Sequence, residues 1–268
     1  MFDGKLSVIL PAYNESHRIE ENIQECCDTF SSLGYDYEII VVDDGSSDST
    51  HLRALGARSK EPGRVRIVRY EKNLGKGNAL ICGSAYASGD IVAFVDSDLE
   101  LHPRQLPSFI ETLVTKPCDV VIGSKLHPLS DVQYPKIRRL YSYCYYGLIR
   151  ILFGLPIKDT QTGLKVFRRE VLNDVLPRLL AKRFAFDIEL LVNAFNRGFR
   201  LTDVPVTVRY SRSFGRIGIR DIAKIFIDTM AIFYRSKIIK YYDGVQANMS
   251  DLECVRSSRE LFEYEIVA

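Results

Sequence analysis

Two aspartates separated by one residue, Asp96 and Asp98, follow an apolar run at residues 91–95. In an extended segment the side chains of residues i and i+2 point to the same side, so these two carboxylates repel each other unless a cation lies between them. Mg²⁺ and Mn²⁺ prefer oxygen ligands and often join one or two carboxylates to substrate phosphates. Glu100 continues the same spacing and is a candidate third ligand. The pattern predicts a divalent-metal site, and the alternative is a solvated acidic turn.

Two more polar segments follow apolar runs earlier in the chain. Residues 11–15 read Pro-Ala-Tyr-Asn-Glu, and residues 43–48 read Asp-Asp-Gly-Ser-Ser-Asp. A carboxylate in such a segment can accept hydrogen bonds from a nucleotide base or a ribose hydroxyl, although Asp-Gly-Ser is also ordinary turn chemistry. The residues alone therefore leave open a nucleotide site and a pair of structural turns.

A lysine between two glycines is a further candidate. Residues 73–77 read Asn-Leu-Gly-Lys-Gly, a loop that can bring Lys76 to a phosphate. The segment lacks the spacing of a P-loop, and no GxGxxG motif follows any apolar run. A kinase, a GTPase and a dinucleotide dehydrogenase are therefore disfavoured.

Alternating strand and helix signals place these polar segments. Apolar runs predict strands at residues 6–10, 38–42, 65–68, 91–95 and 120–122, and helical spacing predicts helices near 19–30, 48–59, 77–87 and 104–115. This alternation predicts an α/β fold with a mostly parallel sheet and helices on both faces. Ligands bind such sheets at the carboxyl ends of the strands, so we expect the three polar segments to meet on one rim.

The pattern changes after about residue 124. It predicts short strands at residues 165–167 and 201–210, a helix at 184–195, and amphipathic helices at about 136–153 and 220–241. We therefore expect a main domain over residues 1–218, followed by an amphipathic helix and an acidic tail over residues 219–268. A striped helix is usually core-facing, but these two can also lie on a membrane surface or join two copies of the chain.

Composition excludes several classes of protein. The 268 residues are 46% hydrophobic and 26% charged with a net charge of +2, which argues against disorder, coiled coil and a dedicated nucleic-acid binder. Residues 200–240 carry nine basic and three acidic side chains, which suggests an anionic partner such as a phosphate or a lipid headgroup. No run of 18 apolar residues occurs, no signal peptide precedes the first strand, and the six cysteines form no CxxC pair, so we expect a cytoplasmic protein with reduced cysteines.

Taken together and in this order, the segments resemble the family 2 glycosyltransferases of the GT-A fold. More narrowly, they resemble the dolichyl-phosphate glucose and dolichyl-phosphate mannose synthases, over roughly residues 5–220. The resemblance rests on VILPAYNE at 8–15, VDDGS at 42–46, NLGKG at 73–77, DSD at 96–98, KDTQTGLKVF at 158–167 and FAFDIELL at 184–191. It implies a metal-dependent GT-A enzyme that uses Mg²⁺ or Mn²⁺.

The resemblance also implies roles for individual residues. Those expected to bind the nucleotide-sugar donor are Pro11, Tyr13, Glu15, Asp44, Lys76, Asp96, Ser97 and Asp98, and those expected to hold the metal are Asp96, Asp98 and Glu100. Those expected to bind the acceptor phosphate are Lys125, Arg138, Ser142 and Arg212, and those expected to act in catalysis are Asp98, Asp159 and Arg212. The Ser-Lys pair common after the glycine of the Arg-x-x-Gly segment is replaced here by Ile217-Gly218, and Lys125 stands where arginine is usual.

The activity that the resemblance implies is transfer of a sugar, with inversion, from a nucleotide diphosphate to a polyprenyl or dolichyl phosphate. The DTQ and FAFDIELL segments are similar to glucose-type synthases and favour a UDP-sugar, whereas the Asp-Leu-x-x-His-Pro run near residue 100 is mannose-type and keeps GDP-mannose open. The expected location is the cytoplasmic face of a membrane, held peripherally. The alternatives are a glycosyltransferase with a hydroxyl acceptor, a nucleotidyltransferase, and an inactive nucleotide-sugar binding module. A nucleotidyltransferase is disfavoured because residues 11–15 are not a glycine-rich basic loop.

Overall fold

A computed structural model describes residues 2–132, 136–180, 185–208 and 219–245 of the chain, and the side chains of residues 136–139 and 219–223 fall outside that description. The centre of the fold is a seven-stranded sheet with the order β3-β2-β1-β4-β6-β5-β7. Its strands are β1 (Lys5–Ala12), β2 (Asp36–Asp44), β3 (Val65–Tyr70), β4 (Ile91–Phe94), β5 (Val120–Ser124), β6 (Lys165–Arg168) and β7 (Leu201–Pro205). The strand that was predicted for residues 201–210 ends at Pro205, and its last two residues lie outside the described ranges.

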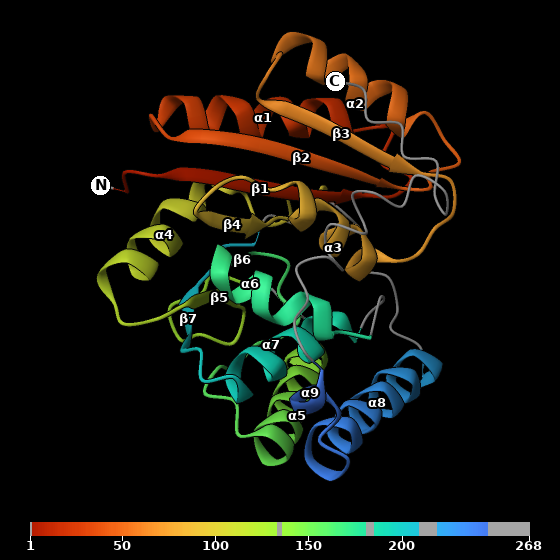
Figure 1. The fold of residues 1–268 in the computed structure, drawn as a ribbon, viewed down its shortest axis with the longest axis vertical. Helices are drawn as coiled ribbons and strands as arrows, with labels where there is room; N and C mark the ends of the chain where they lie inside the picture. Colours follow the sequence, from red (N-terminus) through yellow and green to blue (C-terminus); the bar gives the residue numbers. More distant parts are fainter. Residues whose placement is uncertain (1, 133–135, 181–184, 209–218, 246–268) are drawn as a thin grey trace.

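Helices cover both faces of the sheet, as the alternation predicts (Figure 1). They are α1 (Ile19–Ser32), α2 (Thr50–Lys60), α3 (Lys76–Tyr86), α4 (Leu106–Thr115), α5 (Lys136–Phe153), α6 (Arg169–Val175), α7 (Phe186–Asn196), α8 (Ile219–Phe233) and α9 (Tyr241–Gly244). Short 3-10 helices at Pro103–Gln105 and Leu176–Arg178 and a π-helical turn at Tyr234–Ile238 complete the described elements.

Two buried apolar layers hold these elements together. Side chains of α1, α2 and α4 pack on one face of the sheet, and side chains of α3, α5, α6, α7 and α8 pack on the other. The central strands read as continuous apolar runs because both of their faces are covered, and residues 39–42 of β2 are fully buried. The α/β fold class with a mostly parallel sheet is confirmed.

One strand departs from the parallel pattern. β6 lies between β4 and β5 and runs antiparallel to both, whereas the other neighbouring strands are parallel. The chain between β5 and β6 is long enough to return in either direction, so its length and composition do not fix the direction of β6. This insertion brings the loop before β6 to the carboxyl end of β4.

The helices of the second half gather at one end of the molecule. Figure 1 shows α5, α8 and α9 at the end farthest from α1 and α2, with α7 between them and the sheet. Among the described residues, none of the helices combines the length and the apolar character that crossing a bilayer requires. The acidic tail of residues 246–268 lies outside the described ranges.

Candidate functional site

The carboxyl ends of β1, β2 and β4 open into one cavity of about 510 Å³. It is lined by all eight residues assigned above to the donor, namely Pro11, Tyr13, Glu15, Asp44, Lys76, Asp96, Ser97 and Asp98. Gln161 and Asp187, from much later in the chain, line it as well. The predicted rim is therefore present, and the three polar segments meet there.

Backbone and side-chain hydrogen bonds tie the first two polar segments together. The Asn14 N–H donates to Ser46 Oγ at 2.9 Å, and Asn14 Oδ1 accepts from the Ser47 N–H at 2.9 Å. Asn14 adopts a positive φ of 55°, a conformation that asparagine tolerates better than most residues. The neighbouring Tyr13 side chain is 46% exposed and lines the cavity, where its ring is available to a planar ligand.

The Asp44 carboxylate organises the lysine loop. It accepts hydrogen bonds from the Tyr70 hydroxyl at 2.6 Å, the Leu74 N–H at 2.8 Å and the Gly75 N–H at 2.9 Å. Burial raises the pKa of Asp44, and these three hydrogen bonds to the charged form oppose the rise. The residue after this loop is Lys76, the first residue of α3, so Asp44 fixes the start of the helix that carries the lysine.

Lys76 and Asp96 form an ion pair inside the cavity. Burial acts to lower the pKa of Lys76, but the carboxylates of Asp96, Asp187 and Asp98 together outweigh it and hold that pKa above its usual value. Burial also acts to raise the pKa of Asp96, and the cations of Lys76, Lys165 and Lys125 together more than offset it. Both side chains are therefore charged at neutral pH, and an anionic ligand can be met by the lysine while a cation is met by the aspartate.

The glycine at position 163 makes room for the Asp96 carboxylate. A Cβ atom built on Gly163 would lie 1.9 Å from Asp96 Oδ2 and 2.4 Å from Asp96 Cγ. No side chain larger than hydrogen fits there unless Asp96 moves. The KDTQTGLKVF segment therefore leaves space for the Asp96 carboxylate because residue 163 has no side chain. The sequence alone does not reveal this close approach.

The chain turns at the two aspartates themselves, where the Leu99 N–H donates to the Asp96 carbonyl at 3.0 Å, so the extended geometry expected for residues 96–100 is wrong. Leu99 has a positive φ of 51°, and Asp98 Oδ1 accepts from the Glu100 N–H at 3.0 Å. Glu100 is not among the residues that line the cavity, and its carboxylate lies 3.5 Å from Lys125 Nζ. A metal role for Glu100 and an acceptor role for Lys125 stay predictions.

A smaller hollow of about 70 Å³ adjoins the donor cavity, because Gln161 lines both. Its apolar wall comes from Leu126, Tyr145, Tyr146, Ile149 and Ile157, and its polar wall comes from Ser142, Lys158, Asp159, Thr160 and Gln161. Ser142, predicted to bind the acceptor phosphate, and Asp159, predicted to act in catalysis, therefore lie together beside the donor cavity. The Oγ1 atom of Thr160 is buried without a hydrogen-bond partner, which marks this wall as able to bind a further polar group.

Asp159 serves as a backbone anchor at this place. Its two carboxylate oxygens accept from the Lys125 N–H at 3.1 Å and the Gln161 N–H at 3.0 Å. These bonds join the loop after β5 to the loop before β6. They thereby hold the backbone of Gln161, the residue that lines both hollows. Arg212 and the side chain of Arg138, the other predicted acceptor groups, lie outside the described residues.

A buried lysine, which the sequence analysis did not single out, also belongs to the site. Lys165 is 1% exposed, and its Nζ atom lies 2.7 Å from the Asp187 carboxylate. Asp187 is in the first turn of α7 and lines the donor cavity. A charged residue at the start of the strand predicted at residues 165–167 was the available signal, because such a residue needs a partner when it is buried.

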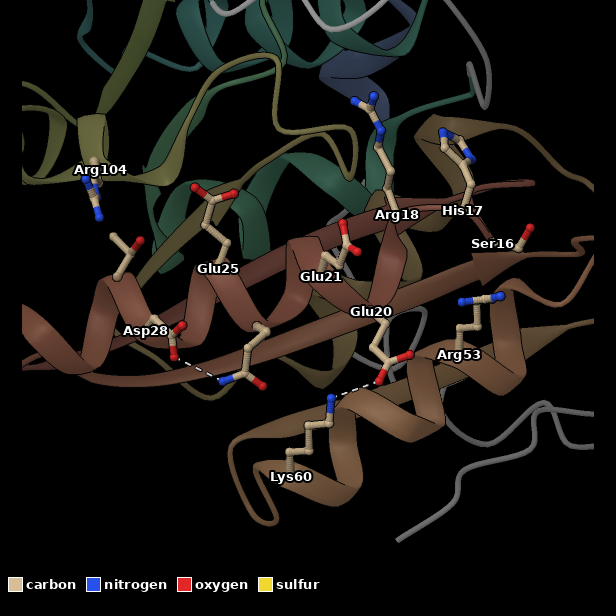
Figure 2. Close-up of a pocket in the computed structure, with 12 residues that line it drawn as sticks. Ser16, His17, Arg18, Glu20, Glu21, Glu25, Asp28, Arg53, Lys60 and Arg104 are labelled. Atoms are coloured by element: carbon tan, nitrogen blue, oxygen red, sulfur yellow. Dashed lines mark hydrogen bonds and ion pairs between the residues drawn. The ribbon is translucent and has the colours of Figure 1, made fainter.

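A second large hollow, of about 560 Å³, lies along α1, and its lining shares no residue with the donor cavity (Figure 2). Its lining mixes both signs of charge, and partners of opposite sign meet there, as in the ion pair of Lys60 with Glu20 at 2.9 Å. The Gln24 amide also donates to Asp28 at 3.0 Å. Because the charges of this lining largely compensate each other, it offers no surface of one sign for an ionic substrate.

The family follows from comparison with known proteins. Residues 7–176 match the model of glycosyl transferase family 2. This chain is a family 2 glycosyltransferase. The sequence resemblance to this family is thereby confirmed, and the cavity that gathers the eight predicted donor residues is its candidate active site.

Curated relatives of this family 2 glycosyltransferase include two dolichyl-phosphate beta-glucosyltransferases and the glycosyltransferase AglD. The chain is 33% identical over 204 residues to glycosyltransferase AglD of Haloferax volcanii, covering 75% of this chain and 32% of AglD. It is 31% identical over 258 residues to dolichyl-phosphate beta-glucosyltransferase ALG5C of Trichomonas vaginalis, covering 91% of this chain and 76% of that protein. The dolichyl-phosphate beta-glucosyltransferase of Saccharomyces cerevisiae is 30% identical over 226 residues, with 75% of this chain and 66% of the yeast protein covered. The chain thus spans about a third of AglD and roughly two thirds or more of the other two.

Solved structures of a related synthase share the fold. Glucosyl-3-phosphoglycerate synthase of Mycobacterium tuberculosis, in complex with Mn²⁺, UDP and phosphoglyceric acid, has a TM-score of 0.65 at 25% identity, covering 91% of this chain and 80% of that one. The same synthase with Mn²⁺ and UDP-glucose has a TM-score of 0.62 at 27% identity, covering 87% and 78%. The GT-A architecture expected from the sequence is therefore the one adopted.

Proposed function

We propose that this glycosyltransferase transfers glucose from UDP-glucose to a polyprenyl phosphate, with inversion of the anomeric carbon. The observation that carries the proposal is the convergence of the eight predicted donor residues on one cavity that adjoins a smaller amphipathic hollow through Gln161. The donor cavity, at about 510 Å³, is of the size that takes a drug-sized ligand. The relatives named dolichyl-phosphate beta-glucosyltransferases support the lipid phosphate and the glucosyl group, and GDP-mannose remains the alternative donor.

The donor set suits a divalent cation that is completed by the substrate. Across the described residues, no three acidic, histidine or cysteine side chains are grouped so as to hold a metal ion. Asp96 and Asp98 both line the cavity, and two carboxylates with diphosphate oxygens are a usual set for Mg²⁺ or Mn²⁺. When bound, the ion would act as a Lewis acid on the departing diphosphate. Solved complexes of the mycobacterial synthase that hold both Mn²⁺ and UDP support this assignment.

A cation, Lys76, is available to the leaving diphosphate, whereas the carboxylate of Asp159 lies on the acceptor side. Lys76 Nζ lies at Asp96, where it can exchange its carboxylate partner for a diphosphate oxygen as the glycosidic bond breaks. The acceptor phosphate monoester has a second pKa near 6, so it is already an anion at neutral pH and needs no strong base. Its oxygen forms the new bond to the anomeric carbon, and the electron pair of the old bond leaves with UDP. Asp159 then acts by holding the polar wall of the smaller hollow in place through its bonds to the Lys125 and Gln161 N–H groups, and does not take a proton.

Assay of sugar transfer between two phases tests this function. We expect radiolabel from UDP-glucose to enter the organic phase only when Mn²⁺ or Mg²⁺ and a polyprenyl phosphate are present. Parallel reactions with other UDP-sugars and GDP-mannose identify the donor. Failure of every donor to label the lipid, with the protein folded, would contradict the proposal.

The mycobacterial structures favour one second acceptor class. They hold phosphoglyceric acid beside UDP-glucose, so a small phosphorylated acid with a hydroxyl acceptor is a candidate for this chain too. A hydroxyl must lose a proton during attack, and one carboxylate that lines the cavity, Asp187, is already engaged by Lys165 at 2.7 Å. The same assay with phosphoglyceric acid in place of lipid decides between them, because the labelled product then stays in water.

We further propose that the chain contacts the cytoplasmic face of a membrane through the helices at the α8 end. Large apolar side chains are exposed there, with Ile151 of α5 at 85%, Ile227 of α8 at 64% and Ile238 of the π-helical turn at 61%. Lys237 and Lys240 lie beside the last of these, as expected of a surface that meets anionic headgroups. Self-association through the same surface is the competing explanation.

Flotation with anionic liposomes separates these two uses of the surface. We expect Phe226→Glu combined with Ile227→Glu to reduce the liposome-bound fraction at least about tenfold, because the burial of two large apolar side chains is lost. Leu52→Glu is the matched control, since Leu52 is 70% exposed on α2 at the other end of the molecule. A wild-type protein that stays unbound and elutes as a dimer would favour self-association instead.

A further inference from the structure

A fully buried carboxylate lies in α7, two residues beyond Asp187. Glu189 has no exposed surface and accepts hydrogen bonds from the Leu180 N–H at 3.0 Å, from Arg235 Nη2 at 3.0 Å and from the Tyr242 hydroxyl. A buried charge is tolerated only with such partners. Two of the three donors come from the C-terminal helices, so this carboxylate joins α7 to the end of the described chain.

Asp187 on the same helix turn faces the donor cavity instead. Residues i and i+2 of an α-helix point about 200° apart, so Asp187 and Glu189 project from nearly opposite sides of α7. Asp187 meets the buried Lys165 at 2.7 Å, and Glu189 meets Arg235. The first turn of α7 is therefore held from both sides by charged pairs, one at the donor cavity and one at the C-terminal helices.

A second buried cation fastens the same C-terminal segment. Arg178 is 6% exposed, and its guanidinium donates to the backbone carbonyls of Tyr242, at 3.2 Å, and Val245. Its other partner is Asp174, at 3.2 Å. The segment from Tyr234 to Val245 is thus bound to the region around α7 through side chains that are withdrawn from solvent, although it also carries exposed apolar residues such as Ile238.

We propose that Glu189 is a positioning residue for the donor site, because it fixes the first turn of α7 and thereby keeps Asp187 in the cavity wall. The C-terminal helices then form part of the donor site's support, and loosening them moves a carboxylate that faces the sugar nucleotide. This inference rests on the proposed function only in taking the cavity to bind a nucleotide diphosphate. It assigns no role to the acceptor.

Donor binding without acceptor tests the inference. Calorimetry with Mn²⁺ and the free diphosphate that the wild type binds, UDP or GDP, should give a Kd raised about tenfold in Tyr242→Phe and in Arg235→Met, as expected for one lost hydrogen bond to a charge. Arg235→Lys should recover part of the affinity, because it restores the charge. Both positions are chosen because Glu189→Ala could prevent folding.

Matched controls keep the result specific. Tyr241→Phe alters the adjacent tyrosine, which is 38% exposed, and should keep the Kd within about twofold of the wild type. Lys237→Met should do the same, because the Lys237 ammonium contacts α7 at its far end, where it lies 3.3 Å from Asn196 Oδ1, and not at its first turn. Variants at Tyr242 and Arg235 that melt at lower temperature but bind with wild-type Kd would show a merely structural role and overturn the inference. A wild type that binds the diphosphate but labels no lipid would refute the acceptor proposal alone, and a wild type that binds neither diphosphate would overturn both.

Discussion

Replacing Asp98 by alanine is expected to lower the kcat of sugar transfer by at least about 10³-fold, because one of the two carboxylates that can hold the cation at the departing diphosphate is lost. Asp98 and Asp96 both line the donor cavity, and within the described ranges no further acidic side chain joins them in a metal-binding group. The remaining carboxylate is already paired with Lys76. Steady-state kinetics with saturating donor and Mn²⁺ measure the effect.

A companion variant separates charge from local structure at this position. Asp98 Oδ1 accepts from the Glu100 N–H at 3.0 Å, so alanine also removes a bond that shapes the turn. Asp98→Asn keeps an acceptor oxygen for that bond but removes the negative charge, and we expect it to be nearly as inactive as Asp98→Ala. Near wild-type turnover in Asp98→Asn would mean that the residue acts through the turn and not through a cation.

Placing a methyl group at position 163 is expected to reduce kcat roughly 10²-fold, the scale of losing one well-placed electrostatic contact. The new Cβ in Gly163→Ala would lie 1.9 Å from Asp96 Oδ2, so the Asp96 carboxylate has to leave its place and its ion pair with Lys76. The protein should still fold, because the clash falls on one side chain at a cavity. Activity assays and calorimetry with UDP and Mn²⁺ measure the loss of turnover and of binding.

The matched control changes a glycine to alanine elsewhere. Gly56 lies within α2, and a Cβ there would be 3.6 Å from Glu20 Oε1, an ordinary contact. Gly56→Ala should leave turnover unchanged and raise stability by roughly 0.5–1 kcal/mol, because alanine favours the helix. If Gly163→Ala kept wild-type kinetics and diphosphate affinity, the position of the Asp96 carboxylate would not matter to the reaction.

The donor side of the site was predictable because its signals are local. A strand buried on both faces reads as an apolar run, and the polar residues that follow it must lie at the sheet's edge, which is why Tyr13, Asp44 and Asp96 could be brought together from sequence. The turn at Leu99 was not predictable in the same way, because the backbone angle of Leu99 decides whether the Glu100 side chain lies on the same side as Asp96 and Asp98. Its positive φ of 51° sends Glu100 away from the cavity lining.

The parts that escaped prediction depend on partners far apart in the chain. Lys165 and Glu189 are buried charges whose partners, Asp187 and Arg235, cannot be chosen from spacing alone. The antiparallel direction of β6 has the same origin, since the preceding connection permits either direction. The resemblance supplied the motif around Gly163 but not the contact that makes a glycine necessary there.

The central claim is that Asp96, Asp98 and Lys76 together receive the diphosphate of a nucleotide sugar through a divalent cation. A crystal structure of this chain with UDP and Mn²⁺ tests it most directly. We predict anomalous density for Mn²⁺ between Asp98 and the diphosphate, the uracil ring beside Tyr13, and Lys76 Nζ moved from Asp96 to a phosphate oxygen. Nucleotide bound in the hollow along α1, or metal density away from both aspartates, would contradict the account.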